Sequence, residues 1–203
     1  KTSDTVNDTS STINNTLFGG TDEVSCDNSK AFIVGNAVTE KGCHPNCPKS
    51  RAVIWNLNKC ITVVGDSSYA VDATGHNGSI YIADDGGFYW VVGNSIEKHQ
   101  LNYSGYKLSE VTGIDVNSNG DVYVAGVVCK TNCKEKNLYN AYWKNGELVK
   151  VFSENADWYS ENHLAADSND NVYVPGYRMK THEVTYSALW INGNRKNLTT
   201  SHD

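Results

Sequence analysis

Residues 111–146 read VTGIDVNSNGDVYVAGVVCKTNCKEKNLYNAYWKNG, and this stretch decides the fold. Two strand-like runs, 111–116 and 121–128, flank a short turn at 117–120. A longer loop then leads to a third run and to the pair Asn145-Gly146, after which a fourth run covers 147–152. Asn-Gly between apolar runs is a strong hairpin signal, because both central residues of a type I′ turn need positive φ. We expect four antiparallel strands here.

The same arrangement recurs along the chain. Phrases of the type Tyr-Val-Ala-Gly begin at four aromatic residues that are 49, 42 and 50 residues apart, namely Phe32, Tyr81, Tyr123 and Tyr173. Each phrase precedes one of four tryptophans in a common local setting: Trp55, Trp90, Trp143 and Trp190. A period of this length is typical of four-stranded propeller blades. A residue type that recurs at one place in each unit is first a packing residue, so we expect these tryptophans in the core.

The strand-like runs are apolar on both faces, as in 80–83, 88–92 and 122–125. A sheet with one wet face would alternate with polar residues, so this pattern is typical of sheets stacked face to face. We predict an all-β fold, a β-propeller of about four four-stranded blades. An open arc or stack of the same blades is the alternative.

The chain divides into a polar N-terminal extension over residues 1–20 and one repeat domain over residues 21–203. The extension contains few large apolar side chains, so it cannot bury enough surface to hold itself in place. It is predicted to be either a disordered glycosylated tail or a strand that is exchanged with, or added to, another copy.

Composition excludes two classes of partner. Lys and Arg total 17 against 23 acidic residues, and no basic cluster is dense enough to follow a phosphate backbone, so nucleic acid is not an expected partner. No apolar run approaches the roughly 18 to 20 residues that span a bilayer, so no membrane span is expected.

Two features indicate an oxidising, extracellular location. Asn-X-Ser/Thr sequons occur at Asn7, Asn14, Asn77, Asn102 and Asn197. The chain also contains 6 cysteines, an even number that suits disulfides. We expect a secreted, N-glycosylated protein.

The cysteines follow the repeat, and this selects a pairing among the 15 that six cysteines allow. Cys43 with Cys47 and Cys129 with Cys133 lie in corresponding loops between second and third strands, each pair with three residues between its cysteines. Antiparallel order places Cys26 and Cys60 together at the opposite rim of the first blade. Zinc at Cys43-His44 to Cys47 is the alternative, but the equivalent loop of the third unit has no histidine.

Asp115, Asn117 and Asn119 place oxygen atoms at alternate positions before Gly120, as at the start of a calcium loop. The position of the bidentate glutamate is Gly126, however, and Asn and Gly are also what a strand-to-strand turn requires. No cofactor is expected, with calcium at these three residues as the alternative. Another acidic pair, Asp84 and Asp85, is expected to be a solvated turn.

The phrases VYVAG (122–126) and AYWKNG (141–146) resemble a repeat of secreted and lipoprotein-type proteins of propeller architecture. The third unit matches best and the second departs most, with Asp-Asp-Gly-Gly where the others have a long loop. The resemblance implies the fold and carries no activity.

The function predicted from these observations is structural. No nucleophile-elbow, zinc-protease or phosphate-loop motif is present, so the chain is expected not to be an enzyme. A short stack with exposed end blades favours contacts with further copies of the chain, in an oligomer or a fibril. Carbohydrate binding is the alternative, with Trp158 and Tyr159 between two units as the candidate contacts, and an extracellular hydrolase is the third hypothesis.

Overall fold

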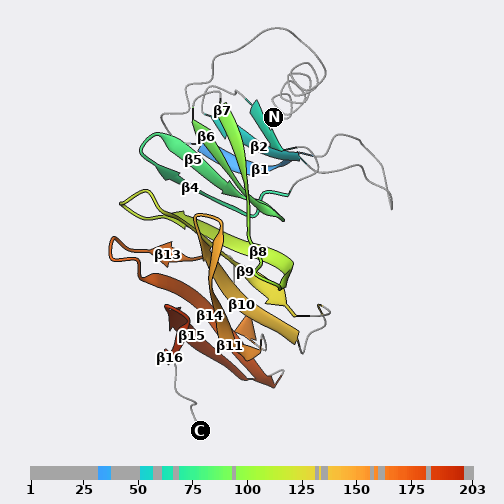
Figure 1. Cartoon of the computed structure of the whole chain (residues 1–203), viewed down its shortest axis with the longest axis vertical. Helices are drawn as coiled ribbons and strands as arrows, with labels where there is room; N and C mark the ends of the chain where they lie inside the picture. Colours follow the sequence, from blue (N-terminus) through green and yellow to red (C-terminus); the bar gives the residue numbers. More distant parts are fainter. Residues whose placement is uncertain are drawn as a thin grey trace, which may run out of the picture.

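The chain forms antiparallel β-sheets, seen in a computed structural model (Figure 1). The structure describes residues 32–37, 51–56, 61–65, 69–92, 95–130, 133, 137–155, 158–159, 163–181 and 184–198. Within these ranges the regular elements are strands, apart from a 3₁₀ residue at Asn137. The all-β prediction is therefore confirmed for this part of the chain.

The strands form four sheets that follow one another in chain order. The first contains β1 (Phe32–Ala37), β2 (Arg51–Asn56) and β3 (Ile61–Gly65). The second contains β4 (Asp72–His76), β5 (Ser79–Ala83), β6 (Gly87–Val92) and β7 (Ser95–Gln100). The third contains β8 (Lys107–Val116), β9 (Val122–Cys129), β10 (Leu138–Lys144) and β11 (Glu147–Asn155).

The fourth sheet departs from the four-strand pattern. It contains β12 (Trp158–Tyr159), β13 (Ala165–Ala166), β14 (Val172–Thr181), β15 (Val184–Ile191) and β16 (Asn194–Asn197). Its first-strand position is divided, because β13 pairs with the start of β14 and β12 pairs further along the same strand. Pro175 lies between the two pairing sites, and a proline has no N–H to donate to a neighbouring strand.

The hairpin turns have the backbone predicted from Asn-Gly. Asn145 and Gly146 have φ of 51° and 87°, and Asn192 and Gly193 have φ of 52° and 77°. The side chain of each asparagine also accepts a hydrogen bond from the first residue of the second strand in its sheet, Val122 N–H in one case and Val172 N–H in the other, both at 2.8 Å. The repeat is therefore preserved at the level of single hydrogen bonds.

Three apolar clusters hold the sheets together, one between each neighbouring pair. The first and second sheets share Ile54, Ile80, Ile82, Tyr89 and Val91, among others. The second and third share Tyr81, Phe88, Val124, Val128 and Trp143, and the third and fourth share Tyr123, Tyr142, Phe152, Val174 and Trp190. Every residue of β9 is buried, because this strand has a sheet on both of its faces.

The first strands of neighbouring sheets lie next to each other. β4 lies against β8, and β8 lies against β13. Ile114 N–H donates to Asp72 Oδ2 at 3.1 Å, and Ala166 N–H donates to Asp115 Oδ2 at 2.9 Å, so a carboxylate of one first strand holds the backbone of the next. In Figure 1 the sheets lie along the longest axis, with the first and fourth at opposite ends. The described sheets thus follow one another along the molecule in chain order.

The tryptophans divide into two groups. Trp143 and Trp190 are Cα partners of Val124 and Val174, and their exposed fractions are 0% and 1%. In the second sheet the partner of the equivalent Ile82 is Tyr89, which leaves Trp90 one residue out of phase and 38% exposed. The core prediction is confirmed for Trp143 and Trp190 and wrong for Trp90, because a shift of one residue along a strand reverses the face. The ring of Trp55 lies outside the described residues.

Candidate functional site

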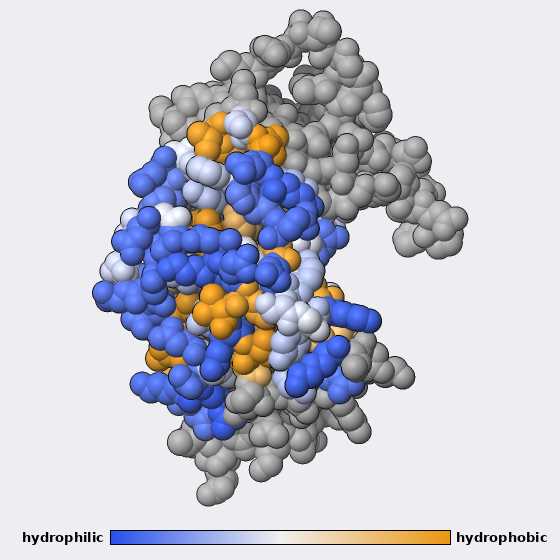
Figure 2. All heavy atoms as spheres, viewed as in Figure 1, coloured by the Kyte–Doolittle hydropathy of each residue, from blue (hydrophilic) through white to orange (hydrophobic). Residues whose placement is uncertain are grey.

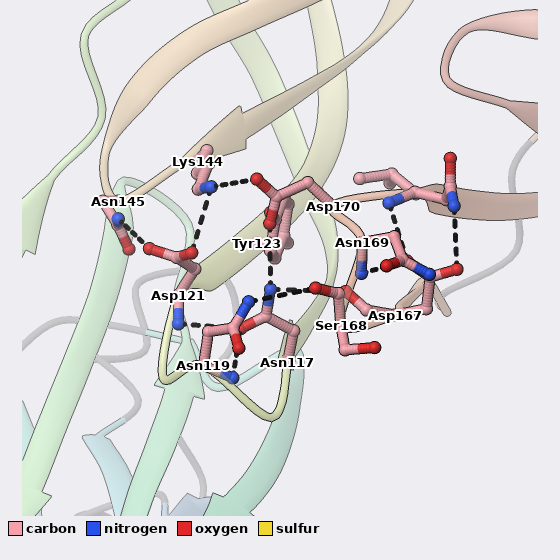
Figure 3. A network of polar contacts seen from close by, with 12 residues as sticks. Asn117, Asn119, Asp121, Tyr123, Lys144, Asn145, Asp167, Ser168, Asn169 and Asp170 are labelled. Atoms are coloured by element: carbon pink, nitrogen blue, oxygen red, sulfur yellow. Dashed lines mark hydrogen bonds and ion pairs between the residues drawn. The ribbon is translucent and has the colours of Figure 1, made fainter.

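A network of polar groups joins the turns of the third and fourth sheets (Figure 3). We call it the turn network; its central residues are Asn117, Asp121, Tyr123, Lys144 and Asp170. Lys144 Nζ lies 2.7 Å from Asp170 Oδ2 and 3.0 Å from Asp121 Oδ2. Tyr123 donates its hydroxyl proton to Asp170 Oδ1 at 2.8 Å, and Asn117 Nδ2 donates to the same oxygen at 3.1 Å. A single carboxylate of the fourth sheet is therefore held by three side chains of the third.

In the turn network the pKa values of the two carboxyl groups are lowered and those of Lys144 and Tyr123 are raised. The hydrogen bond from Lys144 holds the pKa of Asp170 below its usual range, and hydrogen bonds from Asn145 and Lys144 do the same for Asp121. The two carboxylates raise the pKa of Lys144. Burial, followed by the bond to Asp170, raises the pKa of Tyr123 to about 12. Near neutral pH the network is fully charged, with Tyr123 as a neutral donor.

The calcium alternative does not fit this geometry. Asn117 Oδ1 accepts the backbone N–H groups of Asn119 and Asp121, each at 3.0 Å, and Asn119 Nδ2 donates to Ser168 O at 3.1 Å. Asp115 accepts from Thr74 and from Ala166, away from the turn. The three side chains therefore serve as turn and inter-sheet contacts. Within the described residues, no group of His, Cys, Asp and Glu side chains is placed to hold a metal ion.

The fourth sheet repeats the same turn with one change in chemistry. Asp167 stands where the third sheet has Asn117, since each accepts two backbone N–H groups of its own turn. Tyr173, equivalent to Tyr123, donates its hydroxyl proton to Asp167 Oδ2 at 3.0 Å. The tyrosine that reaches the next sheet from the third sheet thus bonds within its own turn in the fourth.

The second sheet has a polar cluster of its own at the opposite rim. Asp84 is fully buried, accepts the Gly86 N–H at 3.1 Å and lies 2.7 Å from Lys98 Nζ. Lys98 also donates to the Tyr89 hydroxyl at 3.1 Å. Burial acts to lower the pKa of Lys98, but the bonds to Asp84 and Tyr89 outweigh it and raise that pKa. The solvated-turn prediction is therefore wrong for Asp84, whereas Asp85 is exposed.

A second feature of this sheet is a row of side chains that crosses three strands, Tyr81 on β5, Trp90 on β6 and Glu97 on β7. They are successive Cα partners, so they share one face of the sheet. The rings of Tyr81 and Trp90 stack with centroids 6.0 Å apart and an interplanar angle of 7°. We call these residues the Trp90 row. It is the exposed aromatic feature for which the repeat gave no signal, because the phase of Trp90 became visible only from strand pairing.

The predicted disulfides and sequons are partly tested. Cys129 and Cys133 form a disulfide with Cα atoms 5.3 Å apart, as predicted. The other cysteines, Cys26, Cys43, Cys47 and Cys60, lie outside the described residues, as do Asn7 and Asn14. Asn77, Asn102 and Asn197 are all exposed, so each side chain is accessible for a sugar.

The carbohydrate contacts predicted at Trp158 and Tyr159 form β12, whose Cα partners are Arg178 and Tyr177. Their rings lie outside the described residues, so the carbohydrate contacts stay a prediction.

A cavity of about 280 Å³ lies between β1 and the start of β4, lined by Val34 and residues 70–73. Its carboxylate, Asp72, already accepts hydrogen bonds from the backbone N–H groups of Ala73 and Ile114. No helix of the described residues could span a membrane.

Comparisons with known proteins give a likeness of shape without a family. No family model matches the chain, and no curated protein matches its sequence. A fucose lectin from Kordia zhangzhouensis, solved with methyl-fucoside, is 10% identical with a TM-score of 0.42, over 64% of this chain and 99% of the lectin. An α-L-arabinofuranosidase from Clostridium thermocellum is 12% identical with a TM-score of 0.37, over 79% of this chain and 64% of that enzyme. Similarities of this size carry no ligand or activity over to this chain.

Proposed function

We propose that the chain is a secreted, glycosylated, non-catalytic structural protein that associates with further copies of itself through the outer faces of its end sheets. We also propose that its sheets are propeller-type blades in an open arc. The contacts between first strands, β4 with β8 and β8 with β13, support the proposal of an open arc. The outer face of the fourth sheet supports the proposal of self-association.

The outer face of the fourth sheet carries apolar side chains and lies on the side opposite to the third sheet. Val174 and Trp190 pack against the third sheet, so their neighbours along each strand point to the opposite side. These neighbours form two cross-strand pairs, Tyr173 with Ile191 and Pro175 with Leu189. Pro175 is exposed and the other three are half-buried.

The third sheet shows what such a face does when a sheet covers it. Its equivalent residues, Tyr123 and Ala125, are 1% and 2% exposed beneath the fourth sheet. No described strand lies in the same way on Tyr173 and Leu189. Burial of apolar area yields about 25 cal/mol per Å², so another copy that covered this face would gain free energy.

The edge of the fourth sheet argues for face-to-face contact over strand addition. The edge strand β16 is only 4 residues long, all of them exposed, and it contains Arg195 and Lys196. Short, charged edge strands disfavour pairing with another chain. The two apolar pairs of the outer face contain no charged residue, and the charge nearest to them in the sheet is Lys196 of β16, the Cα partner of Leu189.

The surface and the cysteines support an extracellular location. Figure 2 shows hydrophilic residues over most of the described surface of that view, interrupted by separate apolar patches. A disulfide between Cys129 and Cys133 is stable in an oxidising compartment. The sequons at Asn77, Asn102 and Asn197 are exposed.

Sedimentation velocity over a range of concentrations tests self-association. We expect the wild-type mass to rise with concentration, and Leu189→Glu to remain monomeric because it places a charge in the proposed contact. Val149→Glu is the matched control, since Val149 is a 51% exposed residue of β11. A wild-type chain that stays monomeric at all concentrations would refute the proposal. If Leu189→Glu associates like the wild type and removal of residues 1–20 abolishes association, the extension makes the contact instead.

A further inference from the structure

The contact between the second and third sheets lacks the polar groups that join the third and fourth. Lys144 is the Cα partner of Tyr123, and Trp90 is the Cα partner of the equivalent Tyr81, so Trp90 stands where the third sheet has Lys144. On the third-sheet side of this contact, Gly120 occupies the position that Asp170 occupies in the fourth sheet. The two residues make the same turn bond, Gly120 N–H to Asn117 O at 3.0 Å and Asp170 N–H to Asp167 O at 3.1 Å.

The space beside Gly120 is open. A Cβ atom added at Gly120 would meet no other atom within 4 Å. The indole of Trp90 is 38% exposed, whereas Lys144 is engaged with two carboxylates. The replacement of a lysine and an aspartate by a tryptophan and a glycine therefore removes a contact and exposes an aromatic ring.

The exposed indole has a fixed orientation. Tyr81 stacks parallel to it on β5, and the His99 ring lies against it with centroids 6.3 Å apart. His99 in turn stacks on the buried Phe88, with centroids 4.8 Å apart. A ring held in place on two sides loses little conformational entropy when a ligand covers it.

The polar neighbour of the indole is a carboxylate. Glu97 is the Cα partner of Trp90, and its side chain is 63% exposed. Its Oε1 lies 3.5 Å from His99 Nε2, and that nitrogen has no hydrogen-bond partner among the described residues. An ionised carboxylate is a hydrogen-bond acceptor only, so a ligand that bonds to it must supply a hydrogen-bond donor.

We propose that the Trp90 row binds the pyranose ring of a glycan. The C–H face of the sugar lies on the indole, and a hydroxyl group at the edge of the ring donates to the Glu97 carboxylate. This ligand matches a site that combines a flat apolar surface with a few polar groups. A protein partner fits less well, because the centres of protein interfaces are depleted in glutamate.

The proposal is tested by adding a panel of methyl pyranosides to the full-length chain and following the indole N–H signal of Trp90 by NMR. We expect at least one pyranoside to shift this signal. At about 10 mM sugar, a site with a dissociation constant near 1 mM is filled. Trp90→Ala should weaken binding at least tenfold, as measured by calorimetry, and Glu97→Gln should weaken it severalfold.

Tyr69→Ala is the matched control, because Tyr69 is an aromatic residue of the linker before β4 and is 56% exposed. It should change affinity less than twofold. Trp90→Lys, which copies the residue of the third sheet, is the second variant if Trp90→Ala does not fold. The proposal is overturned if no pyranoside shifts the signal, if Trp90→Ala or Trp90→Lys binds like the wild type, or if Tyr69→Ala loses binding equally. Binding of an apolar peptide with no response to sugars would overturn the ligand class.

Discussion

The contact between the second and third sheets and the contact between the third and fourth use the same backbone repeat to different ends. In the latter, Tyr123 and Lys144 reach the Asp170 carboxylate and close the rim. In the former, Tyr81 and Trp90 occupy the same positions, Gly120 stands in the place of Asp170, and an aromatic ring is left exposed. The buried part of the repeat therefore specifies the fold. A few rim positions decide whether polar groups join two neighbouring sheets or whether a surface stays open to a ligand.

The largest loss of stability should come from replacing the buried Trp143 by alanine, with the same replacement of Trp90 for comparison. Trp143 is fully buried and its indole N–H donates to Asn102 O at 2.8 Å, so Trp143→Ala should cost about 3–5 kcal/mol of the free energy of unfolding. Trp90→Ala should cost less than this, because Trp90 is 38% exposed at the rim. Urea unfolding curves of both variants check this. Equal losses would contradict the assigned phase of Trp90.

A smaller effect should follow from removing the central carboxylate of the turn network. Asp170→Asn should destabilise the contact between the third and fourth sheets at neutral pH, with Asn169→Ala as a control at an exposed position of the same turn. The pKa of Asp170 is lower in the folded chain, so its contribution is present above the unfolded value of about 3.9 and is lost as pH falls through the folded pKa.

The measurement is the difference in unfolding free energy between wild type and Asp170→Asn at several pH values. That difference should be constant near neutral pH and should shrink in acid, where the wild-type carboxyl group becomes protonated. A difference that grows in acid would show that Asp170 is not stabilised as a carboxylate.

The smallest effect is expected from building a copy of the turn network at the other contact. Gly120→Asp with Trp90→Lys introduces the residue pair of the third and fourth sheets. Gly120 has φ of 87°, but the equivalent Asp170 already has φ of 64°, so aspartate tolerates this backbone. A double-mutant cycle should show a favourable coupling of about 0.2–1 kcal/mol, typical of an exposed ion pair. Zero coupling would mean that the two positions do not face each other.

Much of the fold followed from local sequence. Asn145-Gly146 predicted its turn because positive φ is a local requirement, and the loop positions of Cys129 and Cys133 predicted their disulfide because four residues of separation already bring them close. The phase of Trp90 did not follow. Aligning the units by tryptophan placed it with Trp143, whereas strand pairing aligns Tyr89 there, and no local signal distinguishes two adjacent aromatics in a strand buried on both faces.

Asp84 and Asn117 show the same limit for polar residues. Both stand in turn-like sequences, and both were expected to meet solvent or an ion. Asp84 is instead buried against Lys98, 14 residues away, and Asn117 bonds to Asp170, 53 residues away. Their partners come from another strand or another sheet, so the contacts exist only once the stack has formed.

The amino-acid sequence by itself determined the number of repeat units, their strands and turns, and the apolar character of both sheet faces, because periodicity and turn chemistry act over a few neighbouring residues. The tertiary structure alone decided which aromatic faces the core, which carboxylate is buried and which rim is open. Those outcomes depend on the register between strands and on the contacts between strands and between sheets, which join residues as far apart as Asp84 and Lys98, 14 positions, and Asn117 and Asp170, 53 positions.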